Sequence, residues 1–187
     1  MPKLSHRIRR KTAAIHTTVE KKLFADYEDI KQSEYVRFLL SHYRFQRMLE
    51  EAVARADFTE KTEWKLVNRK KVGKIESDLR KLSFSLEGKI FKENPFSNWT
   101  EAELLGGAYV AEGATLGGRF ILASILKSNV FDLNGSRSFL TGYGSATGMA
   151  WKGFQNLLER EGRGREDEVI HGAQEAFKIF SKQIEEV

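Results

Sequence analysis

The chain has 187 residues, 41% hydrophobic and 30% charged, which predicts one folded globular domain over residues 1–187 and excludes a disordered chain. It has no cysteine, which excludes disulfides, iron–sulfur clusters and cysteine nucleophiles. The net charge of +5 is uneven, because residues 61–92 hold ten Lys and Arg against four Asp and Glu. A solvated helix face is the ordinary explanation of that segment, and a docking surface for an acidic protein is the functional one. Nucleic-acid binding is not expected, because the segment carries no known binding signature.

No stretch reaches the length of a membrane span, and the start of the chain, MPKLSHRIRRKT, lacks the apolar core of a signal peptide. We therefore expect a cytoplasmic protein that contacts no membrane. Only two prolines occur, and apolar residues recur with a period near 3.6, so the fold class is all-α. The first helix is expected from Ser5 to Lys22, and the second from an N-cap at Ser33 to Arg55. Residues 61–82 predict a charged helix or helix pair.

The second half of the chain continues the helical pattern. Thr100 and Glu103 form a T-x-x-E capping box that begins a helix reaching Lys127. A turn is expected over 128–136, then one further helix through residues 139–157 and a last helix over 166–186. No repeat or linker divides the chain.

The helix that begins at Thr100 contains the most unusual stretch, LLGGAYVAEGATLGGRFIL at 104–122. Five glycines fall within thirteen residues: Gly106, Gly107, Gly113, Gly117 and Gly118. Each costs about 1 kcal/mol relative to alanine inside a helix, so the glycines must provide something else. Close packing of two helices is one explanation, and a flat ligand against the glycine backbone is the other.

Histidine is scarce, and His16 is the one that shares a helix face with Thr12 and Glu20. The sequence has no H-E-x-x-H zinc motif, and only Glu168 and His171 have the spacing of a di-iron helix. A lone helix histidine is more often a core or capping group than a ligand. Paired with a glycine-rich helix, however, His16 suits a flat group held between two helices, with the imidazole bound to a central metal.

Two motifs carry a resemblance to a known family. RIRRKTAAIHTTVE (7–20) resembles the first-helix motif of haem oxygenases, and YVAEGATLGGRFI (109–121) resembles the distal-helix motif of the bacterial members. The second helix and the region after FLTGYG are also similar, so the resemblance spans nearly the whole chain. It implies a single-domain haem-oxygenase-like fold with haem between a proximal and a distal helix.

The resemblance assigns roles by position. His16 stands where the proximal iron ligand does, and Glu20 where a carboxylate orients its ring; a surface ion pair with Lys21 or Lys22 is the ordinary alternative for Glu20. Gly113, Gly117 and Gly118 match the distal glycines that steer bound O2, whereas Gly106 and Gly107 are expected to be packing residues. Ala114 replaces the aspartate with which animal members hold a distal water. Arg9, Tyr109 and Lys152 match residues that bind the haem propionates.

The function implied is oxidative cleavage of haem at a meso carbon to biliverdin, CO and ferrous iron. Haem b would be both substrate and cofactor, with O2 and an external electron donor, either a ferredoxin or an NAD(P)H-dependent reductase. A monomer or a weak dimer is expected. Two alternatives remain: a non-enzymatic haem-binding or haem-transfer protein on the same fold, and an all-α relative that binds another small molecule.

Overall fold

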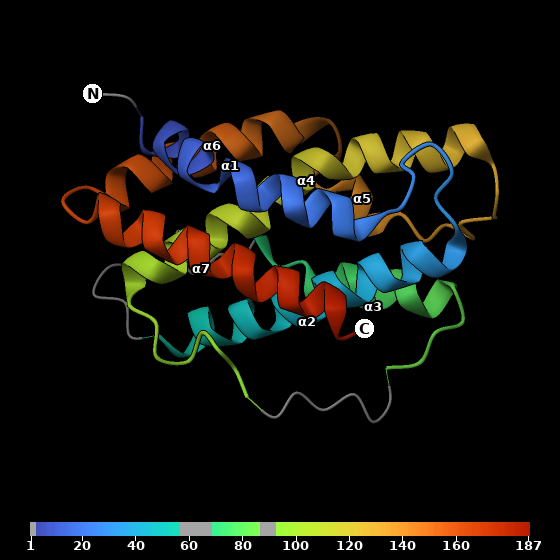
Figure 1. Ribbon diagram of the computed structural model, residues 1–187, viewed down its shortest axis with the longest axis horizontal. Coiled ribbons are helices and arrows are strands. Elements are labelled where there is room, and N and C mark those ends of the chain that lie inside the picture. Colours follow the sequence, from blue (N-terminus) through green and yellow to red (C-terminus); the bar gives the residue numbers. More distant parts are fainter. Residues whose placement is uncertain (1–2, 57–68, 87–92) are drawn as a thin grey trace.

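The computed structural model describes residues 3–56, 69–86 and 93–187, which are helical with short connections and contain no strand (Figure 1). The fold is a single all-α domain, as predicted. The helices are α1 (Leu4–Leu23), α2 (Gln32–Arg55), α3 (Val72–Lys81), α4 (Glu101–Ser128), α5 (Ser138–Thr141), the 3-10 turn η2 (Gly144–Ala146), α6 (Thr147–Glu161) and α7 (Glu166–Glu185). Within these ranges, no helix is long and apolar enough to cross a membrane.

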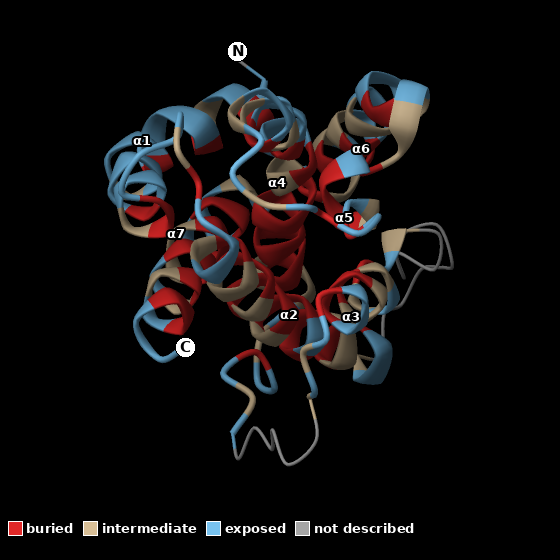
Figure 2. Cartoon of the chain, turned by 90° about the vertical axis from the view of Figure 1, so that its right-hand side faces the viewer, coloured by how far each residue is buried: buried red, intermediate tan, exposed pale blue. Residues whose placement is uncertain are grey.

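Helix α4 is the centre of the packing, and its first half is buried on all sides (Figure 2). It packs most extensively on α7, and also on α2, α5 and α6. Helix α1 packs on α7 and α6 instead, and α1 with α4 is not among the principal helix pairs of the described residues. The two helices that carry the predicted site are therefore joined mainly through α7 and α6.

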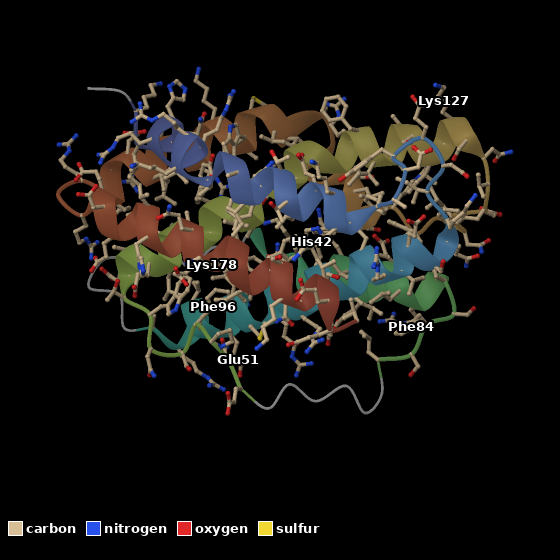
Figure 3. All side chains as sticks on the ribbon, viewed as in Figure 1. His42, Glu51, Phe84, Phe96, Lys127 and Lys178 are labelled. Atoms are coloured by element: carbon tan, nitrogen blue, oxygen red, sulfur yellow. The ribbon has the colours of Figure 1, made fainter. Side chains whose placement is uncertain are left out.

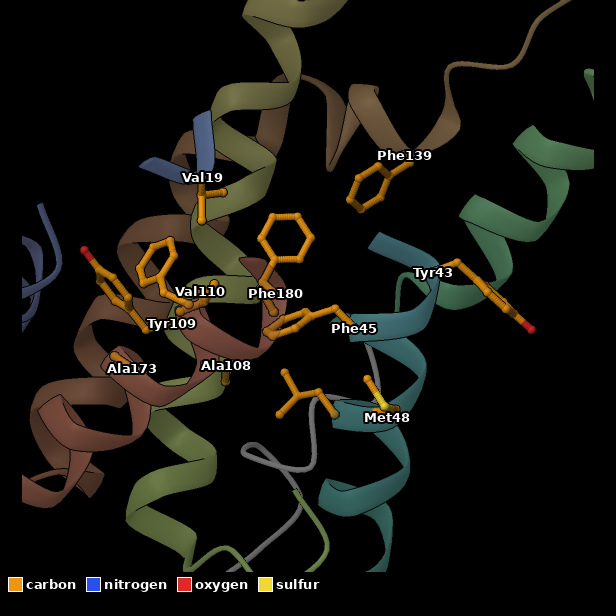
Figure 4. Packing of buried hydrophobic residues seen from close by; sticks show 14 of the residues in the cluster. Val19, Tyr43, Phe45, Met48, Ala108, Tyr109, Val110, Phe139, Ala173 and Phe180 are labelled. Atoms are coloured by element: carbon orange, nitrogen blue, oxygen red, sulfur yellow. The ribbon is translucent and has the colours of Figure 1, made fainter. Parts of the chain in front are cut away.

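Aromatic side chains fill the core between α2, α4 and α7. Phe45 of α2 and Phe180 of α7 meet edge to face with 5.4 Å between their ring centroids. Phe96 packs edge to face on Phe45 with a centroid distance of 5.5 Å. Figure 4 shows Phe45 and Phe180 directed toward one another, with Phe139 of α5 above them. This core fixes α7 against α2, and α7 in turn supports α1.

The glycines Gly106 and Gly172 bring α4 and α7 into backbone contact. A Cβ atom added at Gly106 would lie 2.3 Å from the Val169 carbonyl oxygen, and one at Gly172 would lie 2.4 Å from the Glu103 carbonyl oxygen. A Cβ at Gly107 would lie 3.0 Å from Leu49 Cδ1. Gly106 and Gly107 are therefore packing residues, as predicted.

The predicted capping box at the start of α4 is confirmed. The Thr100 hydroxyl accepts from the Glu103 amide, and the Glu103 carboxylate accepts from the Thr100 amide at 2.9 Å. The N-cap predicted at Ser33 is wrong, because α2 begins one residue earlier, at Gln32. There Glu34 accepts from the Lys31 amide at 3.0 Å, so an acid inside the first turn replaces the serine cap.

Two further predicted segments differ from the structure or lie partly outside its described residues. The single helix predicted through 139–157 is two helices, α5 and α6, because Gly142 and Gly144 adopt φ of 58° and 61° and interrupt the helical backbone. Of the charged segment predicted over 61–82, α3 accounts for residues 72–81, and residues 61–68 lie outside the described part of the chain.

Candidate functional site

His16 lies at the edge of the buried stripe of α1, which consists of Leu4, Ser5, Ile8, Thr12, Val19 and Leu23. Its side chain is 53% exposed although Thr12 and Val19, one turn away on either side, are buried. The Nδ1 atom lies 3.5 Å from a Glu20 carboxylate oxygen, and the Phe177 ring of α7 packs edge-on against the imidazole at 5.5 Å. The ring is thus held from two sides, while the rest of it faces open space.

The opposing surface is one side of α4. Cβ atoms added at Gly113 and Gly117 would meet no atom of the described residues within 4 Å, so the backbone at both positions borders open space. Leu116 and Phe120, which helical spacing places on the same side, are 36% and 80% exposed. We call Gly113 and Gly117 the glycine face. Exposed apolar side chains beside a bare backbone are compatible with a binding site on this side of α4.

Gly118 does not belong to the glycine face. It is buried, and an added Cβ would lie 2.8 Å from the Leu140 carbonyl oxygen, so Gly118 sets the close approach of α4 to α5. Ala114 is half-buried and directly follows Gly113. The structure therefore separates the three predicted distal glycines into two on the open side and one on the packed side.

The positions predicted for propionate binding gather at one end of this space. Burial raises the pKa of the Tyr109 phenol, and the positive charge of Arg9 on α1 acts in the opposite direction, so the two side chains are close enough to interact. Trp151 of α6 packs on Tyr109 at 5.5 Å between centroids. Lys152, the next residue, is exposed. Arg9 thus lies within electrostatic range of Tyr109, and Lys152 follows Trp151 without a described contact to either.

The other end is closed by the loop after α1. The Ser124 hydroxyl of α4 donates to the Tyr27 carbonyl, and the Tyr27 hydroxyl donates to the Glu20 carbonyl at 2.9 Å. Arg9 thus lies near Tyr109, and Tyr27 near Ser124, so α1 and α4 run in the same direction along the two sides of the space. This fixes which parts of the two helices face each other.

Counted along the two helices from Arg9 and Tyr109, His16 is level with the glycine face. With a rise of 1.5 Å per residue, His16 lies about 10 Å along α1 from Arg9, and Gly113 and Gly117 lie about 6 Å and about 12 Å along α4 from Tyr109. By this count, His16 is level with the part of α4 between the two glycines. A flat group placed between them would have a nitrogen ligand on one side and bare backbone on the other.

His16 is a single nitrogen ligand, which fits a metal whose other ligands belong to a bound cofactor. Among the described residues, no three His, Cys, Asp or Glu side chains gather to hold a metal ion. A single histidine is sufficient for a haem, whose ring supplies four nitrogens. A separate cavity of about 540 Å³, lined in part by Tyr43, Glu76 and Arg80, lies between α2 and the segment after α3. None of the site residues lines it.

A second histidine, His42 of α2, is fully buried and was not assigned a role from the sequence. Figure 3 shows His42 in the middle of the molecule. Its ring lies among Phe38, Phe139 and Phe180, with centroid distances of 4.4, 4.8 and 4.5 Å. Burial, assisted by the charge of Lys71, lowers the pKa of His42 to about 3, so the ring is neutral near pH 7. Its Nδ1 has no hydrogen-bond partner in the described part of the chain.

Sequence reasoning also missed the partners of Glu112. This carboxylate is 1% exposed and is bound by Arg69, Lys71 and Tyr143. The available signal was that Glu112 is the only acid between Leu104 and Leu122. An acid in an otherwise apolar helix needs a partner once it is buried, because a buried unpaired charge is costly.

Comparison with known proteins identifies a family and a fold. A family model described as heme oxygenase matches residues 2–186. The NO- and CO-bound heme oxygenase of Neisseria meningitidis superposes with a TM-score of 0.77 at 21% identity, covering 100% of this chain and 92% of that one. The heme oxygenase of Leptospira interrogans gives a TM-score of 0.75 at 13% identity and covers 100% of both chains. No curated protein sequence matches the chain. At these identities the two structures establish the fold.

Proposed function

The chain belongs to the haem oxygenase family, and from this premise we propose that it binds haem between α1 and α4 and cleaves it at a meso carbon to biliverdin, CO and ferrous iron. The observation that carries the proposal is the register of His16 with the open glycine face. When bound, haem supplies the iron that activates O2 and is itself the molecule that is oxidised. The protein has to hold it in one orientation and exclude competing reactions.

His16 is the proposed iron ligand. Its Nδ1 faces the Glu20 carboxylate at 3.5 Å, which leaves Nε2 free to bind a metal. A carboxylate beside the second ring nitrogen fixes the tautomer and increases the basicity of the ligating one. The edge of Phe177 limits rotation of the ring. Glu20 and Phe177 therefore orient an imidazole that is otherwise exposed.

The glycine face is the proposed distal wall. With no side chain at Gly113 or Gly117, the backbone would lie close to a haem held here and would leave room for a small molecule such as O2 in one direction only. We propose that Ala114 leaves room for ordered water in place of an acidic side chain, as the sequence suggested. Gly118 contributes indirectly, by allowing α4 to lie close to α5.

The propionates are proposed to lie at the Arg9–Tyr109 end. Burial raises the pKa of Tyr109, so the phenol stays protonated and can donate a hydrogen bond to a carboxylate. Arg9 supplies a positive charge that is always present. Lys152 is exposed near this end and is the third proposed contact. Anchoring both propionates here would fix the rotation of the haem in its own plane.

Oxidative cleavage of haem by O2 to biliverdin and CO consumes electrons, which a donor has to supply. We propose a ferredoxin or an NAD(P)H-dependent reductase as donor, acting in the cytoplasm. The basic segment 61–92, together with Arg9 and Arg10, is the proposed docking surface. If charge guides docking, reductase-driven turnover should fall as salt is raised, whereas turnover with ascorbate should not.

The decisive experiment is a hemin titration of the whole protein, followed by turnover with ascorbate or a reductase. We expect a Soret band at one hemin per chain, followed by its loss as biliverdin and CO form. His16→Ala should abolish the wild-type Soret band. His171→Ala is the matched control, because His171 is also an exposed helix histidine beside carboxylates, Glu103 and Glu175, and should bind hemin normally.

The outcomes separate the alternatives. Hemin binding without biliverdin would support the haem-binding or haem-transfer function. No Soret band at all, or a band that His16→Ala leaves unchanged, would overturn the proposed site. Biliverdin formation that depends on His16 would establish the oxygenase.

A further inference from the structure

A buried ionic cluster lies at the flank of α4. Glu112 accepts from Lys71 Nζ at 2.5 Å, from Arg69 Nη1 at 2.7 Å and from the Tyr143 hydroxyl at 2.9 Å. Burial and the negative charge of Glu112 both raise the pKa of Tyr143, so its hydroxyl stays protonated and donates. We call these four residues the Glu112 cluster. None of them belongs to the haem site proposed above.

The Glu112 cluster joins α4 to two other parts of the chain. Arg69 also donates to the Ala150 carbonyl of α6, at 3.2 Å from Nη1. The Lys71 amide, directly before α3, donates to Glu50 of α2 at 2.6 Å. Tyr143 lies in the turn between α5 and α6. One carboxylate therefore connects α4 with the start of α3 and with the α5–α6 turn.

The position of Glu112 on α4 determines what this connection controls. Successive helical residues are rotated by about 100°, so Glu112 lies roughly a quarter turn from Gly113. The glycine face is open, and the side opposite it carries Ala111, Thr115 and Gly118, all buried. Glu112 is thus at the flank between the open and the packed side. A fixed point at the flank resists rotation of a helix about its own axis.

The other buried residues nearby provide little directional restraint. Thr115 donates to the Glu112 carbonyl of its own helix, Gly118 has no side chain, and Ile121 makes only apolar contacts. Between residues 112 and 121, Glu112 is the residue whose side chain hydrogen-bonds outside α4 within the described part of the chain. Apolar contacts alone would let the helix turn by small angles, because they have no preferred direction.

We propose that Glu112 is a positioning residue, whose buried carboxylate fixes the rotation of α4 and so holds the Gly113 and Gly117 backbone toward His16. Apolar residues of similar volume often stabilise a fold as well as a buried ion pair does, so stability alone does not require Glu112 here. What the ion pairs add is a defined geometry. The consequence for haem rests on the proposed function, but the restraint on α4 does not.

The restraint can be tested without haem, by hydrogen exchange of the whole protein. Glu112→Gln should accelerate exchange of the amides of residues 113–121 by about tenfold or more, while the first half of α4 exchanges as in the wild type. Tyr143→Phe removes a single hydroxyl and should give a smaller increase in the same segment. Glu101→Gln is the matched control, since Glu101 is a partly exposed acid of the same helix that pairs with Arg165.

The second arm uses the CO complex of the hemin-loaded, reduced protein. The C–O stretching band depends on the groups next to the bound CO, so a rotated or mobile α4 should broaden or split the band in Glu112→Gln. The Soret band should keep its wild-type intensity, because His16 is unchanged. A variant that only lost stability would unfold at lower temperature without changing this band.

Two results would overturn the proposal. One is wild-type exchange over residues 113–121 in a folded Glu112→Gln protein. The other is an unchanged C–O band in that variant. If Glu112→Gln does not fold, Tyr143→Phe decides by the same two measurements. If the wild-type protein binds no hemin, the proposed function fails, while the exchange experiment still decides whether Glu112 positions α4.

Discussion

Replacing Gly117 with alanine should stabilise the haem-free protein. The position is inside α4, and an added Cβ would meet no atom within 4 Å. Glycine in a helix interior costs about 1 kcal/mol relative to alanine, and nothing in the surroundings opposes the larger residue. We therefore expect Gly117→Ala to raise the free energy of unfolding by about 1 kcal/mol. In a chain of this size that corresponds to a rise in Tm of about 2–4 °C.

The same substitution should weaken the function. The methyl group would project into the space where we place the haem and its distal ligand, so hemin affinity and turnover should fall. Gly117→Leu should abolish turnover. Gly118→Ala provides the opposite control: its Cβ would lie 2.8 Å from the Leu140 carbonyl oxygen, so it should destabilise the haem-free protein by about 1–3 kcal/mol.

The assay compares urea unfolding, followed by circular dichroism, with a hemin titration of the same preparations. The reasoning predicts opposite signs for Gly117→Ala: greater stability without haem and weaker binding with it. A haem-free Gly117→Ala protein less stable than the wild type would mean that the position is packed. Unchanged hemin binding and turnover in Gly117→Leu would refute the distal assignment.

Three further substitutions test the supporting structure. Burial lowers the pKa of His42 from 6.5 to about 3, so between these two pH values the unfolded chain binds more protons than the folded one. The free energy of unfolding should therefore fall by up to about 1.4 kcal/mol for each pH unit below pH 6.5. His42→Leu should flatten this slope, measured by urea unfolding between pH 6.5 and 5. Asp78 accepts hydrogen bonds from the part-buried Ser138 amide and the buried Phe139 amide at the start of α5, so Asp78→Ala should cost about 3 kcal/mol in the same assay at pH 7. A loss below about 1 kcal/mol would mean that these hydrogen bonds do not stabilise the fold. Gly106→Ala forces the α4 and α7 backbones apart and should lower Tm by several degrees, in contrast to the rise expected for Gly117→Ala.

The helices could be predicted where a local pattern decides them. Thr100 and Glu103 begin α4 because both halves of a capping box lie within four residues. The division between α5 and α6 was missed because apolar periodicity continues across it. Only the positive φ of Gly142 and Gly144 shows that the backbone turns there, and glycine in a sequence does not reveal its φ.

Part of the candidate site could be predicted as well, because it too depends on local patterns in the sequence. His16 and the glycines of α4 lie in motifs of fixed local spacing. The side of α4 on which Gly118 is packed could not be predicted. Gly117 and Gly118 are rotated by about 100° from one another around the helix, and only the position of α5 shows which of the two is packed. The partners of Glu112 lie 43, 41 and 31 residues away along the chain, so no local pattern identifies them.

Because one side of α4 is open, the helix is held from its other sides, and two of the contacts that do so involve α3 or the residue just before it. No atom in the described part of the chain would lie within 4 Å of a Cβ at Gly113 or Gly117, so this half of the helix is held from its flank and its back. Lys71, just before α3, binds Glu112 at the flank. Asp78 of α3 accepts from the Phe139 amide of α5, and the Leu140 carbonyl of the same helix lies against Gly118. Helix α3 is not among the principal neighbours of α4 in the described residues, yet both restraints lead back to it. Substitutions in α3 should therefore alter the distal wall without touching it.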